Sequence, residues 1–318
     1  MEVSHMKNVN LIPQKNSFLR KVYKQRYLLI MVIPGVIFML VFNLYPVYFA
    51  QIGFKEYNVT MGTNLSLAHW VGLSYIKEFL NSPDFSNVMI NTIGISFFKL
   101  LVGFPIPIIF ALLLNEIKQS KFKKFIQTVT YLPHFLSWII VAGIMLIWLA
   151  DSGLLTKALY HMHIVDDTSN MLANANYFWA ISVISELWKE FGWNSIIYLA
   201  AIAGIDMELF EAARIDGAGK FRQIWNITLP SIAPTVVLML ILSISGLFGS
   251  NFDQIFVLRN AVNAPASNVI DIYVYQQSFM YNRFDYATAV GLFRSLVSAI
   301  LLVGANAFAR RSTGNSIF

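Results

Sequence analysis

The chain has 318 residues, of which 57% are hydrophobic and only 13% are charged, and its mean hydropathy is +0.59. Soluble domains carry roughly 25% charged residues, so this composition argues against a soluble domain and indicates an integral membrane protein. The net charge of +6 does not indicate nucleic-acid binding, because the basic residues cluster at the ends of apolar segments. The chain has no cysteine, which excludes disulfides and thiolate metal sites.

The first 26 residues are polar and basic. They are too polar for a signal peptide, and the apolar run that follows them is too long for the hydrophobic region of one. We therefore expect a basic N-terminal tail at residues 1–26, followed by a membrane span that is retained.

Six segments approach the roughly 20 apolar residues that a spanning helix needs. They cover about residues 27–49, 88–114, 125–149, 178–203, 232–257 and 286–309. The predicted fold is all-α, with six transmembrane helices in a domain at 27–311 and a short C-terminal tail at 312–318. No internal repeat is visible, which argues against a carrier built from inverted repeats within one chain.

The distribution of basic residues predicts the topology. Fifteen Lys and Arg residues lie in the N-terminal tail, the second-to-third loop, the fourth-to-fifth loop and the C-terminal end, whereas five lie in the other three loops. Because cytoplasmic loops carry the excess of Lys and Arg, both termini and the fourth-to-fifth loop are expected on the cytoplasmic side.

Charged and polar residues inside the spans are candidates for a solute pathway. Glu186, Glu190 and Asn194 follow one another at helical spacing in the fourth span, with Lys189 beside them, and Lys99 lies midway along the second span. Ionisable groups within a membrane are costly, so they face the bundle interior or a wet cavity. Two interpretations stay open: ion pairs that only fix helix packing, and side chains that line a path.

Other charged and aromatic residues extend this set. Arg294 in the sixth span is expected, like Lys99, to pair with glutamates of the fourth span. Trp188, Trp193 and Tyr198 are candidate platforms for a sugar ring, although Trp and Tyr are also enriched at membrane interfaces.

The outer end of the fifth span holds a second polar cluster, Asn251, Asp253 and Gln254. This cluster is a candidate for receiving the solute or for forming a gate. His134 in the third span is interpreted as a packing residue. No metal-ligand spacing and no nucleophile–base arrangement is present, so no catalytic residue and no metal site are predicted.

The fourth-to-fifth loop, about residues 205–230, contains the stretch EAARIDGAGKFRQIWNITLP. It resembles the end of a phosphate-binding loop, but that motif needs a glycine where Arg214 stands and a Ser or Thr where Phe221 stands. Asp206 is a plausible N-cap of a short helix, and Gly217 suits a turn. A second short helix is expected from Phe221 onwards, ended by Pro230. A loop resting on lipid headgroups is the alternative.

These residues also carry a resemblance. Glu211-Ala212-Ala213, Gly217 and the later Leu229-Pro230 resemble the EAA loop of membrane subunits of ABC importers, and EAARIDGA with the LP pair is similar to their carbohydrate-uptake branch. The stretches YLPHFLSW (131–138), NFDQ (251–254) and YATAVGL (286–292) are similar to the subgroup that imports complex oligosaccharides. Met207 departs from the family, which often has proline there.

The resemblance implies a permease subunit in a bacterial cytoplasmic membrane. Its partners would be a second permease subunit, two cytoplasmic ATPase subunits and an extracellular solute-binding protein. ATP and Mg would bind the ATPase subunits, so no cofactor and no catalytic residue are expected on this chain. The expected ATPase-coupling residues are Glu211, Ala212, Ala213, Arg214, Asp216, Gly217, Leu229 and Pro230. The candidate pathway residues are Lys99, Glu186, Trp188, Glu190, Trp193, Asn194, Asn251 and Asp253.

Three alternatives stay open to different degrees. The same architecture can serve another solute, such as a polyamine, an amino acid or phosphate. A self-sufficient secondary transporter is less favoured, because repeats are lacking and the loop has a docking pattern. A membrane-embedded enzyme is disfavoured by the lack of a catalytic constellation.

Overall fold

The computed structural model describes residues 22–249, 251–314 and 317, without the side chains of residues 312 and 313. The chain divides into two units, Met1–Gln51 and Ile52–Phe318. Most of the predicted N-terminal tail and most of the predicted C-terminal tail lie outside the described residues.

In its described residues, the first unit is mainly one apolar helical run. It comprises α2 (Arg26–Met39), the π-helical turn η1 (Leu40–Leu44) and α3 (Tyr45–Phe49). Pro46 follows η1, and its missing N–H removes a bond from the α-helical ladder, which a π turn accommodates. Large apolar side chains are exposed along the whole run, as expected of a helix that faces lipid.

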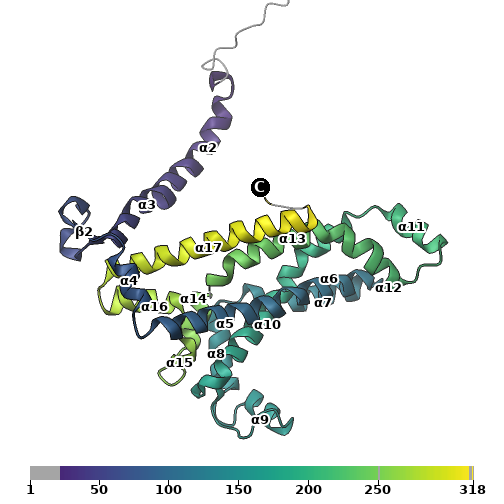
Figure 1. Cartoon of the computed structure of the whole chain (residues 1–318). Coiled ribbons are helices and arrows are strands. Elements are labelled where there is room, and N and C mark those ends of the chain that lie inside the picture. Colours follow the sequence, from purple (N-terminus) through teal and green to yellow (C-terminus); the bar gives the residue numbers. More distant parts are fainter. Residues whose placement is uncertain (1–21, 250, 315–316, 318) are drawn as a thin grey trace, which may run out of the picture. The chain divides into compact units, whose positions relative to one another are not determined.

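The second unit consists mainly of helices joined by short connections (Figure 1). Its α-helices are α4 (Ser74–Leu80), α5 (Phe85–Gly103), α6 (Pro105–Glu116), α7 (Ser120–Tyr131), α8 (Trp138–Trp148), α9 (Leu154–His161), α10 (Ala175–Ala203), α11 (Met207–Ile215), α12 (Lys220–Gln223), α13 (Leu229–Ser245), α14 (Phe252–Leu258), α15 (Ala264–Ser267), α16 (Ile270–Tyr275) and α17 (Phe284–Thr313).

Shorter elements complete the second unit. The antiparallel strands β1 (Lys55–Glu56) and β2 (His69–Trp70) form a small hairpin. The π turns are η7 (Ile224–Thr228) and η9 (Gln276–Met280). The 3-10 turns are η2 (Ala50–Phe54), which begins at the boundary between the units, η3 (Val59–Met61), η4 (Leu65–Leu67), η5 (Leu132–Phe135), η6 (Met171–Ala173) and η8 (Gly246–Phe248).

Four helical segments of the described chain are long and apolar enough to cross a membrane: 26–54, 85–116, 220–248 and 284–311. A fifth candidate is the bent pair Ser120–Phe135 and Trp138–Trp148. The helix α10 covers the remaining predicted span with 29 residues, but it carries Glu186, Lys189 and Glu190 in its middle. The all-α membrane fold is therefore confirmed, with four or five candidate spans by length and composition.

Two predicted spans differ in shape from the expectation. The third, predicted as one helix over 125–149, is bent by 99° between η5 and α8. Ser137 begins the new helix as its N-cap, since its side chain accepts a hydrogen bond from the Ile140 N–H at 3.4 Å. The fifth, predicted over 232–257, leaves the α-helix after Ser245, where Gly246 begins η8, and α14 is a separate helix.

The segment before α13 also corrects the prediction. A separate second short helix ended by Pro230 was expected, but α12, η7 and α13 form one continuous helical run through Pro230 and Pro234. The π turn η7 ends two residues before Pro230 of α13, as η1 ends two residues before Pro46 of α3. The helix thus continues although proline lacks an N–H donor, because the π turn changes the local hydrogen-bonding pattern.

The helix α10 lies at the centre of the second unit and packs against α5, α6, α7, α13 and α15. Three buried apolar clusters stabilise this arrangement, one of them between α6, α10 and α13 around Tyr198. A Cβ atom on Gly192 of α10 would overlap the Thr130 carbonyl of α7, so glycine permits this close approach. The same central helix carries most of the charged span residues.

Candidate functional site

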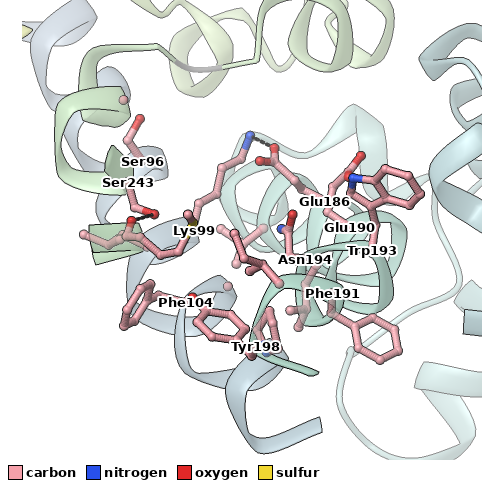
Figure 2. Close-up of a pocket in the computed structure, with 18 of the residues that line it drawn as sticks. Ser96, Lys99, Phe104, Glu186, Glu190, Phe191, Trp193, Asn194, Tyr198 and Ser243 are labelled. Atoms are coloured by element: carbon pink, nitrogen blue, oxygen red, sulfur yellow. Dashed lines mark hydrogen bonds and ion pairs between the residues drawn. The ribbon is translucent and has the colours of Figure 1, made fainter. Parts of the chain in front are cut away.

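A cavity of about 700 Å³ lies beside α10 and is walled by α5, α6, α13 and η8. Figure 2 shows its two ends: Lys99 and Glu186 meet at one end, and the rings of Phe104 and Tyr198 lie at the other. Trp193 and Asn194 also line it. The cavity therefore combines charged, amide and aromatic surfaces within a bundle of apolar helices.

Lys99 is the centre of a polar network that joins three helices. Its ammonium group pairs with the Glu186 carboxylate on α10 and donates a hydrogen bond of 2.6 Å to Gln254 Oε1 on α14. Asn251 Nδ2 donates to Glu186 Oε2 at 3.3 Å. The predicted pairing of Lys99 with a glutamate of the fourth span is confirmed.

Gln254 is a member of this network that the sequence placed in a different cluster. It is fully buried, and its Nε2 donates to the Ser182 carbonyl at 2.7 Å and to Ser185 Oγ at 2.8 Å. Its oxygen accepts from Lys99, so the side-chain amide is satisfied on both sides. The sequence shows that the start of α14 is rich in amide side chains. It does not show that this part of α14 packs beside α10, which only the fold reveals.

A second network holds the bend between η5 and α8. His134 Nδ1 lies 2.6 Å from Glu190 Oε2, and the ring stacks on Trp193 with centroids 4.2 Å apart. Lys189 Nζ donates to Glu190 Oε1 at 2.9 Å and to the His134 carbonyl at 2.8 Å. Helix α10 thus supplies a donor to a carbonyl at the helix break, and the same lysine pairs with a neighbouring glutamate of its own helix.

Arg294 does not pair as expected. It forms an ion pair with Asp271 of α16, whereas a glutamate of the fourth span was predicted. The sequence stretch around Asp271 was interpreted as an external loop, and the structure folds it into α16, which packs against α17. Arg294 pairs with Asp271 because α16 packs against α17, the helix that carries Arg294.

The predicted pathway residues divide into two groups. Lys99, Glu186, Glu190, Trp193 and Asn194 line the cavity. Three others are not among the lining residues: Asn251, which contacts Glu186, and Trp188 and Asp253, whose side chains are exposed elsewhere. The sequence did not single out the cavity's phenylalanines and serines, such as Phe104 and Ser96.

The helix α11 carries the EAA residues and has no buried residue. Asp206 begins it, accepting a hydrogen bond from the Glu208 N–H at 3.0 Å. Gly217 ends it at a φ of +74°, and the Ala218 N–H donates to the Ala213 carbonyl at 2.8 Å, as in a glycine-terminated helix. Ile215 is 88% exposed. The predicted cap, helix and turn are confirmed, and the helix presents its surface to solvent.

The residue that resembles a phosphate-loop lysine makes an ion pair. Lys220 Nζ lies 2.6 Å from Glu116 Oε2 at the end of α6. Gln223 Nε2 donates to the Ala218 carbonyl at 2.8 Å and closes the turn between α11 and α12. These contacts connect the α11 segment to the helices that wall the cavity.

A polar cluster lies where α4 meets the beginning of α17. Tyr75 donates from its hydroxyl to Asp285 Oδ2 at 2.6 Å, and Arg283 pairs with Glu78 at 2.7 Å. Burial and the hydrogen bond to Asp285 raise the pKa of Tyr75 above its usual range. In the described part of the chain, no group of three or more Asp, Glu or His side chains is arranged to hold a metal ion.

Several apolar helices around an internal polar and aromatic cavity define a multi-pass membrane protein. Residues 103–314 match the family model described as "Binding-protein-dependent transport system inner membrane component". The chain belongs to this family and is thus a membrane component of a transport system that depends on a binding protein.

Curated relatives cover nearly the whole chain. Protein LplB of Bacillus subtilis (strain 168) is 38% identical over 95% of this chain and 94% of its own length. The polygalacturonan/rhamnogalacturonan transport system permease protein YteP of the same organism is 37% identical over 96% and 94%. The arabinooligosaccharides permease AraP, also from B. subtilis, is 31% identical over 85% and 83%.

A solved structure also matches. It is a bacterial alginate ABC transporter in complex with an alginate pentasaccharide-bound periplasmic protein, and the TM-score is 0.84 at 32% identity, covering 94% of this chain and 99% of that one. The predicted resemblance to ABC importer permeases is confirmed, and this chain is a transport subunit.

Proposed function

We propose that the chain forms one half of the membrane pathway of an ATP-driven importer for oligosaccharides, in the cytoplasmic membrane of a bacterium. The observation that carries this proposal is the cavity beside α10, in which Trp193, Tyr198 and Phe104 stand with Asn194 and the charged pair Lys99–Glu186. Aromatic rings suit the apolar C–H faces of sugars, and polar side chains suit their hydroxyls.

The relatives support the substrate class. YteP is named as a permease for polygalacturonan and rhamnogalacturonan and AraP as one for arabinooligosaccharides, and the matching solved structure is of an alginate transporter. A permease for a non-sugar solute has no comparable support among these relatives.

The proposed topology has six spans, with α10 as the fourth, both termini cytoplasmic and the α11 loop on the cytoplasmic side. The domain boundaries 27–311 and the two tails follow from it. It is supported by the basic residues of the loops, and by Figure 1, in which α11 lies at the opposite end of the second unit from α4. The charges within α10 are compatible with a span because Glu186 and Glu190 are paired.

The α11 helix is the proposed contact with a cytoplasmic ATPase subunit. Ala212 and Ala213 leave a slim face for close seating, Glu211 and Arg214 offer polar contacts, and Gly217 fixes the bend. Asp216 at the end of α11 and Leu229-Pro230 at the start of α13 complete the predicted coupling set. The ion pair between Lys220 and Glu116 supplies a connection from this loop to the cavity wall.

The complete importer would contain a second permease subunit, two ATPase subunits and an extracellular solute-binding protein. ATP and Mg would bind the ATPase subunits, and this chain would contribute no cofactor. The experiment is reconstitution of the complex in liposomes with a panel of radiolabelled oligosaccharides. We expect uptake that requires ATP and the ATPase subunits. Uptake by this chain without any ATPase would contradict the proposal, as would ATP-driven uptake of amino acids or polyamines but of no oligosaccharide.

The topology can be tested separately because the chain has no cysteine. A single cysteine at Lys118 is expected to react with an impermeant maleimide only from the cytoplasmic side, and one at Lys157 only from the outside. Reaction of both from one side would contradict the six-span arrangement.

A further inference from the structure

The cavity wall of this chain is electrically balanced. The charged side chains that line it are Lys99, Glu186 and Glu190. Lys99 pairs with Glu186, and Lys189 behind the wall pairs with Glu190. Two ammonium groups therefore face two carboxylates, and these four groups leave no excess positive charge on this wall.

The ammonium group of Lys99 is held away from an incoming anion. Its side chain is 12% exposed, and Glu186 and Gln254, which both contact it, belong to different helices. Glu186 is held in turn by Asn251 at 3.3 Å and is more exposed, at 27%. A carboxylate on a sugar that enters the cavity therefore meets the like charge of Glu186 before it reaches the lysine.

We propose that Glu186 makes this wall of the pathway selective for uncharged glycan units, by occupying the Lys99 ammonium group that would otherwise bind an acidic sugar. The inference rests on the proposed function, and it narrows the substrate class. The proposal gives this chain a preference different from the substrates named for two similar proteins. YteP is named for polygalacturonan and rhamnogalacturonan, and the solved importer for the acidic polysaccharide alginate. The contacts left to a neutral sugar are the rings of Trp193 and Tyr198 and the amide of Asn194.

The test compares matched glycans that differ only in charge. The complete complex in lipid nanodiscs, without the solute-binding protein, is titrated with oligogalacturonates and with their fully methyl-esterified forms, and with gluco- and mannuronate oligomers beside their neutral counterparts. Glu186→Gln removes the masking charge while keeping an acceptor for Lys99, and we expect it to raise the ratio of acidic to neutral affinity at least tenfold. The double variant Lys99→Met with Glu186→Gln removes both charges, and its ratio should stay within twofold of the wild type.

Two results would overturn the inference. One is a double variant that loses acidic-glycan affinity tenfold or more, because Lys99 would then already bind uronates in the wild type. The other is a Glu186→Gln variant with an unchanged ratio in a complex that still assembles, as judged by size exclusion. Absence of binding of any glycan to a complex that imports oligosaccharides would also contradict the inference while leaving the proposed function intact. Failure of all ATP-driven glycan import would instead remove the proposed function.

Discussion

Replacing Lys189 with methionine tests how α10 holds the break in the third predicted span. The residue is 5% exposed, and its ammonium group donates to the His134 carbonyl at 2.8 Å and to Glu190 at 2.9 Å. Methionine keeps most of the packing but leaves a carbonyl at the helix break without this donor, which costs about 1–3 kcal/mol. Loss of one partner of a buried ion pair costs about 3–5 kcal/mol. The low end of this range applies here, because the Glu190 carboxylate still contacts His134 and is 23% exposed.

The expected total is a loss of about 4–6 kcal/mol in the free energy of unfolding. At about 2–4 °C per kcal/mol for a large domain, the apparent melting temperature of the detergent-purified protein should fall by roughly 8–24 °C. The matched control is Lys157→Met on the exposed face of α9, which should change it by less than 2 °C or so. Adding Glu190→Gln to Lys189→Met should restore part of the loss. Equal melting temperatures for Lys189→Met and the control would show that Lys189 does not stabilise the helix break.

Three further predictions concern turns, packing and pH. Gly217→Val forces a branched residue to adopt a φ of +74°, which costs about 1–2 kcal/mol. Stimulation of the ATPase subunits by this variant should therefore fall severalfold. The control Gly219→Val should retain the stimulation, because Gly219 has a φ of −68° and lies in open space. Gly94→Ala would push a methyl group into the Trp179 ring, and a loss of about 1–3 kcal/mol in unfolding free energy is expected; an unchanged melting temperature would count against this packing. The folded pKa of Tyr75 is raised by burial and by its hydrogen bond to a carboxylate, so the stability it contributes is complete below about pH 10 and is lost above, where the unfolded phenol ionises. Tyr75→Phe should therefore flatten the fall of melting temperature above that pH, and an equally steep fall would contradict this.

Composition and apolar runs were sufficient to predict an all-α membrane protein, because spanning helices have a length and polarity that few other structures share. The cap at Asp206 and the turn at Gly217 were also predictable, since both depend on local backbone chemistry. Pro230 was interpreted as a helix stop, and it is not one, because the π turn before it absorbs the missing N–H. Nothing in the residue pattern distinguishes that outcome from a break.

The candidate site was predictable one helix at a time but not across helices. Helical spacing placed Glu186, Glu190 and Asn194 on one face, and all three line the cavity. The partner of Arg294 and the role of Gln254 depend on which short helices pack beside them, and this information is absent from any single segment. Contacts between residues far apart in the sequence cannot be read from either segment alone. The polar cluster at the start of α14 was therefore interpreted as a site that receives the solute or forms a gate, and its hydrogen bond to Lys99 was not predicted.

In the proposed function, the cavity beside α10 carries the glycan. In this cysteine-free chain, Asn194→Cys would place a single reactive thiol on the cavity wall. The most direct measurement is its rate of modification by a small maleimide in the reconstituted complete importer, with ATP and with or without a transported oligosaccharide. We expect the transported oligosaccharide to slow labelling several-fold, and a glycan that is not transported to have no effect. Equal labelling rates during active import would contradict it.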